Sequence, residues 1–299
     1  MRWVLGIHGG AGLIARTHLT EAQERTAREG LEAALDAGSA VLDGGGTALD
    51  AVQAAIVVLE DHPTFNAGRG SVLNAAGDVE MDAALMDHDQ RAGAVAACRT
   101  TRNPIRAARA VLEDGLHVLL AGPGADAFAA ERGLAQVDPS AFLVDARREQ
   151  LARLQSYGGY ALDHDAPKGT VGAVALDVHG RLAAGNSTGG MANKRPGRVG
   201  DSPVPGAGTW CDARVAVAAT GHGELFLRTG AAASLAARVR FGAVTVAEAA
   251  DAVLAEVQAL GGDGGLLALD ASGTLVLPFV SGGMYRGWAR PGERGTAIW

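Results

Sequence analysis

A threonine that could act as a nucleophile stands where a polar segment of the chain meets an apolar one. Residues 158–169 are polar and interrupted by Gly and Pro, which is typical of an exposed linker. Residues 170–176 are apolar and suit a buried strand that begins at Thr170. A threonine hydroxyl needs an adjacent base to become a good nucleophile, but threonine also simply suits the start of a strand. The local pattern alone leaves both interpretations open.

A second short motif would place a serine nucleophile in the chain. Residues 185–189 match the pattern G-x-S-x-G, with Ser187 at its centre. That motif requires a strand, a sharp turn and then a helix, and residues 190–197 are poor helix formers. The serine-hydrolase interpretation is therefore disfavoured. The sequence also contains no H-E-x-x-H or G-x-x-x-x-G-K-[ST] motif, and its eight histidines show no metal-ligand spacing.

The elements that would position these residues can be predicted from capping signals and apolar spacing. Capping boxes are predicted at Thr20 with Gln23, at Thr47 with Asp50, and at Thr245 with Glu248, and Asn103 followed by Pro104 predicts another helix start. Helices are expected from these starts and also over 141–157, 230–240 and 246–260. Strands are expected over 3–7, 79–86, 92–98, 170–176, 182–187, 215–220, 224–227, 266–270 and 274–280.

The order of these elements indicates an α+β fold. Helices cluster and strands cluster, twice over, which argues against a regular parallel βαβ sheet. Strands that are apolar on both faces must be covered on both sides. Two stacked sheets with helix layers outside them satisfy both observations. No internal repeat is visible in the sequence.

Composition excludes several classes of protein. The 299 residues carry a formal net charge of −7, which disfavours nucleic acid or an anionic membrane as a partner. No stretch approaches the roughly 20 apolar residues of a membrane span, and the first residues have too short an apolar run for a signal peptide. Cys98 and Cys211 form no C-x-x-C pair and suit buried thiols in a reducing compartment. A cytoplasmic protein is expected.

Segments along nearly the whole chain, in order, resemble the plant-type asparaginase/isoaspartyl peptidase family. These segments are His8–Gly12, Phe65–Ser71, Glu80–Ala83, Gly169–Asp177, Ser187–Met191, Asn193–Lys194, Gly197–Pro203, Gly206–Thr209, Thr220–Glu224 and Met284–Gly287. Each piece alone is a weak signal, but the ordered set is highly specific. The resemblance implies one N-terminal-nucleophile hydrolase domain over 1–299. Its fold would be an αββα four-layer sandwich with two mainly antiparallel sheets between helix layers.

The resemblance also implies a chemistry for Thr170. The precursor would cut itself between Gly169 and Thr170, giving an α chain of residues 1–169 and a β chain of residues 170–299. The free amine of Thr170 would then act as base for its own hydroxyl. The implied activity is hydrolysis of the β-amide of L-asparagine and of the isopeptide bond of β-aspartyl dipeptides.

Further roles carry over from the family position by position. Thr188 resembles the threonine that orients the new amine. Arg198 resembles the clamp on the substrate α-carboxylate, and Asp201 resembles the acceptor for its α-ammonium group. Thr220 and Gly221 resemble the oxyanion hole, and Gly223 resembles a further substrate contact.

The resemblance extends to an ion-binding loop and to assembly. Residues 59–70 resemble a loop whose main-chain carbonyls bind sodium or potassium, a hard cation that carbonyl oxygens suit. The residues concerned are Leu59, Glu60, Phe65, Ala67 and Arg69. Asn66 would brace this loop near the active site. No cofactor is required for the chemistry. The family usually forms a dimer of αβ units and acts on small molecules.

Some positions depart from the commonest family pattern, and other functions remain open. Lys168 stands where histidine is usual, His222 stands where threonine is common, and Phe279–Gly282 replaces a stretch that often carries asparagine. Glycosylasparaginase and threonine aspartase share the fold. From a different class, the chain could be an uncleaved, non-enzymatic homologue that only binds a partner.

Overall fold

Two β-sheets lie face to face in the computed structural model, which describes residues 3–12, 14, 19–156 and 169–299. The larger sheet has the strand order β12-β11-β1-β5-β6-β2-β3-β4, and the smaller has the order β10-β9-β8-β7. In the larger sheet the bounds are β1 Val4–Gly12, β2 Met81–Asp87, β3 Ala92–Cys98, β4 Leu119–Ala121, β5 Val171–Leu176, β6 Leu182–Thr188, β11 Gly283–Arg290 and β12 Glu293–Ala297. In the smaller sheet they are β7 Thr209–Cys211, β8 Val215–Gly221, β9 Gly264–Asp270 and β10 Leu275–Val276.

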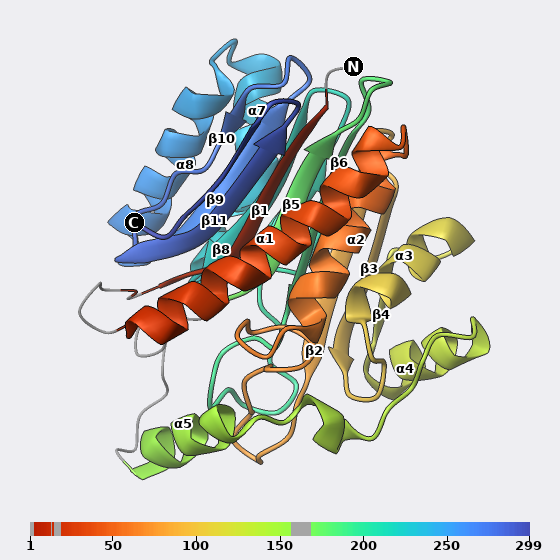
Figure 1. The fold of residues 1–299 in the computed structure, drawn as a ribbon, viewed down its shortest axis with the longest axis vertical. Coiled ribbons are helices and arrows are strands. Elements are labelled where there is room, and N and C mark those ends of the chain that lie inside the picture. Colours follow the sequence, from red (N-terminus) through yellow and green to blue (C-terminus); the bar gives the residue numbers. More distant parts are fainter. Residues whose placement is uncertain (1–2, 13, 15–18, 157–168) are drawn as a thin grey trace.

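Helices cover the outer faces of both sheets (Figure 1). Their bounds are α1 Glu21–Asp43, α2 Ala48–Asp61, α3 Pro104–Asp114, α4 Gly122–Glu131, α5 Asp145–Ser156, α6 Gly223–Thr229, α7 Ala231–Phe241 and α8 Val246–Ala259. Helices α1, α2 and α3 pack on the larger sheet, and α7 and α8 pack on the smaller one. The four-layer αββα arrangement expected from the sequence is confirmed.

The space between the sheets is filled by small and medium apolar side chains. Val174 and Leu176 from β5 meet Ala216, Ala218 and other residues of the smaller sheet in one buried cluster. Every described strand pairing is antiparallel except that of β3 with β4. Strand β5 lies between β1 and β6 in the middle of the larger sheet. Strand β5 is therefore held from both sides.

The capping signals fix helix starts, although two of them act differently from the prediction. The capping boxes at Thr20 and Thr245 are confirmed. Thr47 accepts the Asp50 N–H, but the short Asp50 side chain reaches only the Thr47 hydroxyl, at 2.7 Å, so that box is incomplete. Asn103 makes no side-chain cap bond.

Other elements depart from the expected pattern. Residues 224–227 were expected to be a strand, but they belong to α6, which packs against α7 and α8. The expected strand over 274–280 is reduced to the two residues of β10. Strands β4, β7, β11 and β12 and helix α4 were not predicted, because they are short or rich in polar and glycine residues. No described helix is long and apolar enough to cross a membrane.

A buried carboxyl group joins three of these elements near the end of α2. One oxygen of Glu60 accepts the Ile105 N–H of α3 at 3.0 Å and the hydroxyl of Ser187 in β6 at 2.6 Å. Its other oxygen has no hydrogen-bond partner among the described residues. Burial raises the pKa of Glu60 from 4.5 to about 7, while the bonds from Ser187 and Ile105 lower it. The folded state therefore holds this proton more tightly than the unfolded chain does.

Glu60 should make stability fall as pH rises. Between pH 4.5 and 7 the folded carboxyl keeps a proton that the unfolded chain has lost, so the free energy of unfolding decreases through this window. We expect Glu60→Gln to flatten that decrease. Urea unfolding at pH 5, 6 and 7 measures it, in a Thr170→Ala background chosen because the sequence predicts self-cleavage at Thr170. Glu131→Gln, at an exposed carboxyl, is the matched control. Equal slopes in both variants would contradict this role of Glu60.

Candidate active site

The hydroxyl of Thr170 lies among other hydroxyls at the end of two paired strands. Strands β5 and β6 are antiparallel and pair Val171 with Ser187. The next residues outward are Thr170 and Thr188, and the Thr170 hydroxyl donates to Thr188 Oγ1 at 3.1 Å. Ser202 Oγ lies 3.2 Å away on the other side. Thr170 is only 7% exposed, so this nucleophile candidate is largely shielded from bulk water.

The oxygen of Thr188 is itself held by a buried loop. Thr188 Oγ1 accepts the Gly190 N–H at 2.9 Å. The fully buried Asn66 donates from its amide to the Gly190 carbonyl at 2.7 Å and accepts the Val72 N–H at 2.9 Å. The structure thus brings Asn66 to the active-site side of its loop. Asn66 fixes Gly190, and Gly190 fixes the hydroxyl that receives the Thr170 hydrogen bond.

The residue before Thr170 is packed so closely that a side chain there would crowd its neighbours. A Cβ on Gly169 would lie 3.0 Å from Thr220 Oγ1 and 3.1 Å from the Ala11 carbonyl oxygen. A Cβ on Gly10 would lie 2.4 Å from the Gly169 nitrogen. The segment before β5 is therefore pressed between β1 and the end of β8, with the Thr220 hydroxyl beside Gly169. Thr220 is fully buried and accepts the Ala11 N–H at 3.4 Å.

Arg198, Asp201 and Gly223, which were expected to bind the charged groups of an amino-acid substrate, lie close together. A Cβ on Gly223 would lie 2.8 Å from Asp201 Oδ1 and 2.9 Å from Arg198 Nη2. The Arg198 guanidinium binds Glu224 through two parallel hydrogen bonds of 2.8 and 2.7 Å. That geometry shows a guanidinium which already accommodates a carboxylate in the bidentate manner.

Asp201 is a buried carboxyl group with capacity left to bind. It is 3% exposed, and its Oδ2 atom has no hydrogen-bond partner among the described residues. Burial raises the pKa of Asp201 to about 7, and the positive charge of Arg198 opposes that rise. A ligand ammonium group would favour the ionised form and satisfy the open oxygen.

Several residues with a place in this site were not assigned a role from the sequence. Ser202 and Glu224 stand in segments that carry the family resemblance, but no spacing rule singles out one hydroxyl or carboxyl among neighbours. His8 likewise stands in the His8–Gly12 segment, and its ring reaches the carbonyl oxygen of Thr170 at 2.9 Å. Only the folded arrangement of strands shows these contacts.

The structure excludes the interpretation of Ser187 as the serine of a nucleophile elbow. Ser187 lies inside β6 and is fully buried, and its hydroxyl donates a hydrogen bond to the Glu60 carboxyl group. Residues 189–200 form turns rather than the helix that a nucleophile elbow requires. Gly185–Thr188 is therefore the end of strand β6.

The loop expected to hold a cation folds back on the end of α2. Arg69 N–H donates to the Glu60 carbonyl at 2.7 Å, and Gly70 N–H donates to the Phe142 carbonyl at 3.0 Å. Phe65 and Ala67 are fully buried. Main-chain carbonyl oxygens of such a loop are suitable ligands for an alkali-metal ion. Lys168 and the linker over 158–168 lie outside the described residues.

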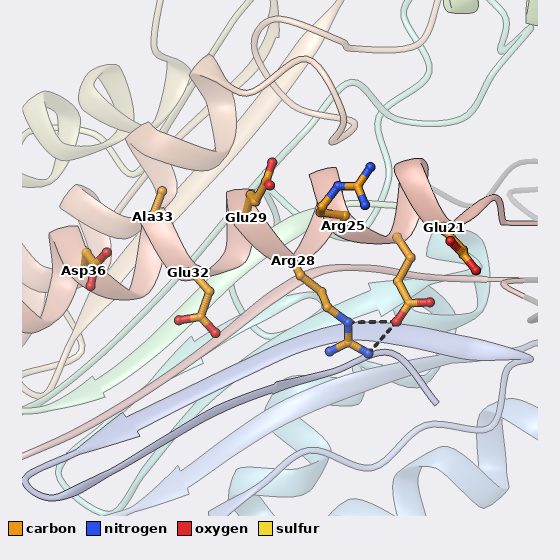
Figure 2. Close-up of a pocket in the computed structure, with 8 residues that line it drawn as sticks. Glu21, Arg25, Arg28, Glu29, Glu32, Ala33 and Asp36 are labelled. Atoms are coloured by element: carbon orange, nitrogen blue, oxygen red, sulfur yellow. Dashed lines mark hydrogen bonds and ion pairs between the residues drawn. The ribbon is translucent and has the colours of Figure 1, made fainter.

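A broad surface groove lies elsewhere. The groove has a volume of about 530 Å³ and follows the exposed face of α1 (Figure 2). Its lining residues are Glu21, Glu24, Arg25, Arg28, Glu29, Glu32, Ala33 and Asp36. Arg28 and Glu24 form an i,i+4 ion pair of 2.8 Å there, the usual pattern of a solvated helix face. None of these side chains takes part in the hydroxyl cluster, so chemistry rather than cavity size identifies the site.

Comparison with known proteins gives a consistent picture over the whole chain. A family model described as asparaginase matches residues 1–298. The isoaspartyl peptidase of Salmonella typhimurium is 48% identical over 303 residues, which cover 98% of this chain and 97% of that protein. The isoaspartyl peptidase of Escherichia coli is 47% identical, with 98% and 94% covered. The human isoaspartyl peptidase/L-asparaginase is 42% identical, with 98% and 95% covered.

Close packing at Gly10 should be required for the cut before Thr170. Gly10 and Gly45 both have positive φ, +108° and +76°, but only Gly10 faces another atom within 4 Å of an added Cβ. We expect Gly45→Ala to cost about 1–2 kcal/mol of stability through backbone strain alone and to leave cutting intact. Gly10→Ala should in addition displace Gly169 and slow or abolish cutting. Intact mass over days and urea unfolding measure both effects. Cutting of Gly10→Ala at the wild-type rate would contradict the packing argument.

Proposed function

The chain belongs to the asparaginase family, and on that premise we propose that it cuts itself before Thr170 and then hydrolyses β-amide bonds of aspartate. The substrates we propose are L-asparagine and β-aspartyl dipeptides, as the names of its relatives suggest. The observation that supports this best is the Thr170 hydroxyl, held by Thr188 and Ser202 and placed next to the closely packed Gly169.

Self-cleavage would use this hydroxyl on its own chain. Thr170 Oγ1 attacks the carbonyl carbon of Gly169, and the peptide bond to the Thr170 nitrogen breaks as an ester to Oγ1 forms. Water then hydrolyses the ester, which leaves a carboxylate on Gly169 and a free amine on Thr170. The Thr220 hydroxyl lies beside Gly169 and can stabilise the negative charge that develops on the carbonyl oxygen.

The free amine then makes Thr170 a self-sufficient nucleophile. An ordinary α-amine has a pKa of about 7.7–8.0, so roughly a tenth is neutral at pH 7. The neutral amine takes the hydroxyl proton while Oγ1 attacks the β-carboxamide carbon of the substrate. Thr220 and the Gly221 N–H stabilise the oxyanion. Ammonia or an amine leaves with the proton, and water releases aspartate from the acyl-enzyme.

The α-carboxylate and the α-ammonium group of the substrate would each bind a charged side chain. Arg198 is the partner we propose for the α-carboxylate, and its bidentate contact with the Glu224 carboxylate supports that role. Asp201 is the partner for the α-ammonium group, and Gly223 leaves space between the two. Asparagine and β-aspartyl dipeptides share this head group and differ only in what leaves.

Four further features complete the proposal. One domain would span 1–299. A sodium or potassium ion would be held by main-chain carbonyls of the loop around Leu59, Glu60, Phe65, Ala67 and Arg69. It would stabilise the loop that carries Asn66, without a part in the chemistry. Two cut αβ units would pair as a dimer. A cytoplasmic location is consistent with Cys98 and Cys211, which are buried and unpaired.

Replacing Thr170 should abolish both reactions. We expect wild-type protein to yield a chain that begins at Thr170, and Thr170→Ala to stay whole after days at neutral pH. Intact mass and N-terminal sequencing measure cutting, and release of aspartate from asparagine and β-aspartyl dipeptides measures activity. Thr101→Ala, which removes another buried hydroxyl, one that donates to Asp126, is the control for general disruption. A wild-type chain that stays whole would favour the binding-protein alternative.

The raised pKa of Asp201 should make head-group binding depend on pH. Below about pH 7 the carboxyl of the empty site is protonated and must lose its proton to bind an ammonium group. Inhibition by L-aspartate should therefore weaken as pH falls from 7.5 to 5.5, approaching about tenfold per pH unit. Succinate lacks the ammonium group and serves as the matched control. If both inhibitors show the same pH dependence, Asp201 does not bind the ammonium group.

A further inference from the structure

A buried histidine contacts the backbone of Thr170 from the opposite side of the proposed cut. His8 lies in β1 and is fully buried. Its Nδ1 atom lies 2.9 Å from the Thr170 carbonyl oxygen, and its Nε2 atom lies 3.1 Å from Asn186 Oδ1. His8 belongs to the first chain after cleavage, and Thr170 begins the second.

The side chain of His8 holds Thr170 beyond the end of the backbone pairing between β1 and β5. The register of these strands ends with His8 opposite Gly172. Thr170 therefore lies past the last paired residue on this side. The imidazole reaches along the strand and gives the Thr170 carbonyl a donor that the β1 backbone does not supply there.

The ring has little freedom to move away. A Cβ on Gly172 would lie 2.4 Å from His8 Nε2 and 2.1 Å from Asn186 Oδ1, so the ring and the amide occupy the space above a glycine. Asn186 is also buried, and its amide nitrogen lies 2.8 Å from the Gly208 carbonyl and 2.9 Å from Thr209 Oγ1. The orientation of the imidazole is thus set by packing on several sides.

The partners of the ring decide which nitrogen carries the proton. Burial lowers the pKa of His8 to about 4, so the ring is neutral at pH 7 and has a single N–H. A backbone carbonyl can only accept a hydrogen bond. The Asn186 NH₂ group donates to Gly208 and Thr209, so its Oδ1 faces Nε2 and both ring nitrogens lie next to acceptors. A ring with one N–H can donate to only one of them, and the shorter contact is the one from Nδ1 to the Thr170 carbonyl, at 2.9 Å against 3.1 Å.

We propose that His8 is a positioning residue for the nucleophile: its Nδ1–H holds the Thr170 carbonyl and ties the new N-terminus to the 1–169 chain. This inference rests on the proposed function. The cut removes the peptide bond from Gly169, which was the covalent restraint on the Thr170 nitrogen. A fixed carbonyl then restricts rotation of Thr170 about its backbone. That keeps the amine and Oγ1 in the geometry for attack, where small displacements are costly.

Two conservative variants separate this role from simple packing. An asparagine side chain can place its NH₂ near the position of Nδ1, whereas the longer glutamine places it near Nε2. We expect His8→Gln to lower kcat by about 10–100-fold and His8→Asn to recover most of that loss. KM for asparagine should change little, because His8 does not touch the head-group residues. Rates are normalised to the cut fraction from intact mass.

The outcomes that would overturn the proposal are distinct. Equal kcat for wild type and both variants would remove any role of His8 in positioning. Equal loss in both variants, in step with a loss of stability in urea, would assign it to packing. A measurement on the wild-type protein stays informative even if a variant does not fold: ¹⁵N NMR of the His8 ring at pH 7 should show the proton on Nδ1. A proton on Nε2 would refute the proposal.

Failure of the proposed function would look different. The NMR experiment reports the tautomer whether or not the chain hydrolyses asparagine. A wild-type chain that neither cuts itself nor releases aspartate, with Nδ1 protonated, would refute the function and leave only the structural contact. A wild-type chain that does both, with Nε2 protonated, would refute the role of His8 alone.

Discussion

The hydrogen bond between the hydroxyls of Thr170 and Thr188 is the contact on which the rest of the site depends. It exists because β5 and β6 are antiparallel neighbours in the middle of the larger sheet, so that the residues flanking their last pair face each other. Strand β1 supports β5 from the other side, and Asn66 fixes the chain that follows Thr188. A rigid sheet rather than a loop therefore sets the position of the nucleophile, which suits a reaction that depends on orientation.

The high glycine content and low aromatic content of the chain follow from the close approach of backbone segments around Thr170. The sequence has 43 glycines and only 4% aromatic residues. At Gly10, Gly169, Gly172 and Gly223 an added Cβ would lie within 3.0 Å of another atom. Such spacing leaves the interior to alanine, valine and leucine, which pack densely without large rings. The same spacing brings polar backbone and hydroxyl groups together within hydrogen-bond distance of Thr170.

The sequence predicted the layers of the fold and most helix starts, because capping residues and apolar periodicity are local signals. It failed where tertiary packing decided the outcome. Residues 224–227 are apolar enough for a strand, yet they form a helix against α7 and α8. The site residues Thr188, Arg198, Asp201 and Thr220 were identified through family resemblance, not through spacing. The contacts of His8, Ser202 and Glu224 join segments up to 178 residues apart, which no local pattern encodes.

On the proposed mechanism, the same groups serve two successive reactions, and this explains why Gly169 and the substrate amide demand similar surroundings. Before the cut, Gly169 lies beside Thr220, and an added Cβ there would lie 3.0 Å from the Thr220 hydroxyl oxygen. After the cut, the β-amide of a substrate takes that place, with the Thr220 hydroxyl again facing the reacting carbonyl. The head-group partners Arg198 and Asp201 are not needed for the first reaction. They would bind the charged groups of the substrate only in the second, so selectivity for aspartate derivatives can be built without altering the geometry that cuts the chain.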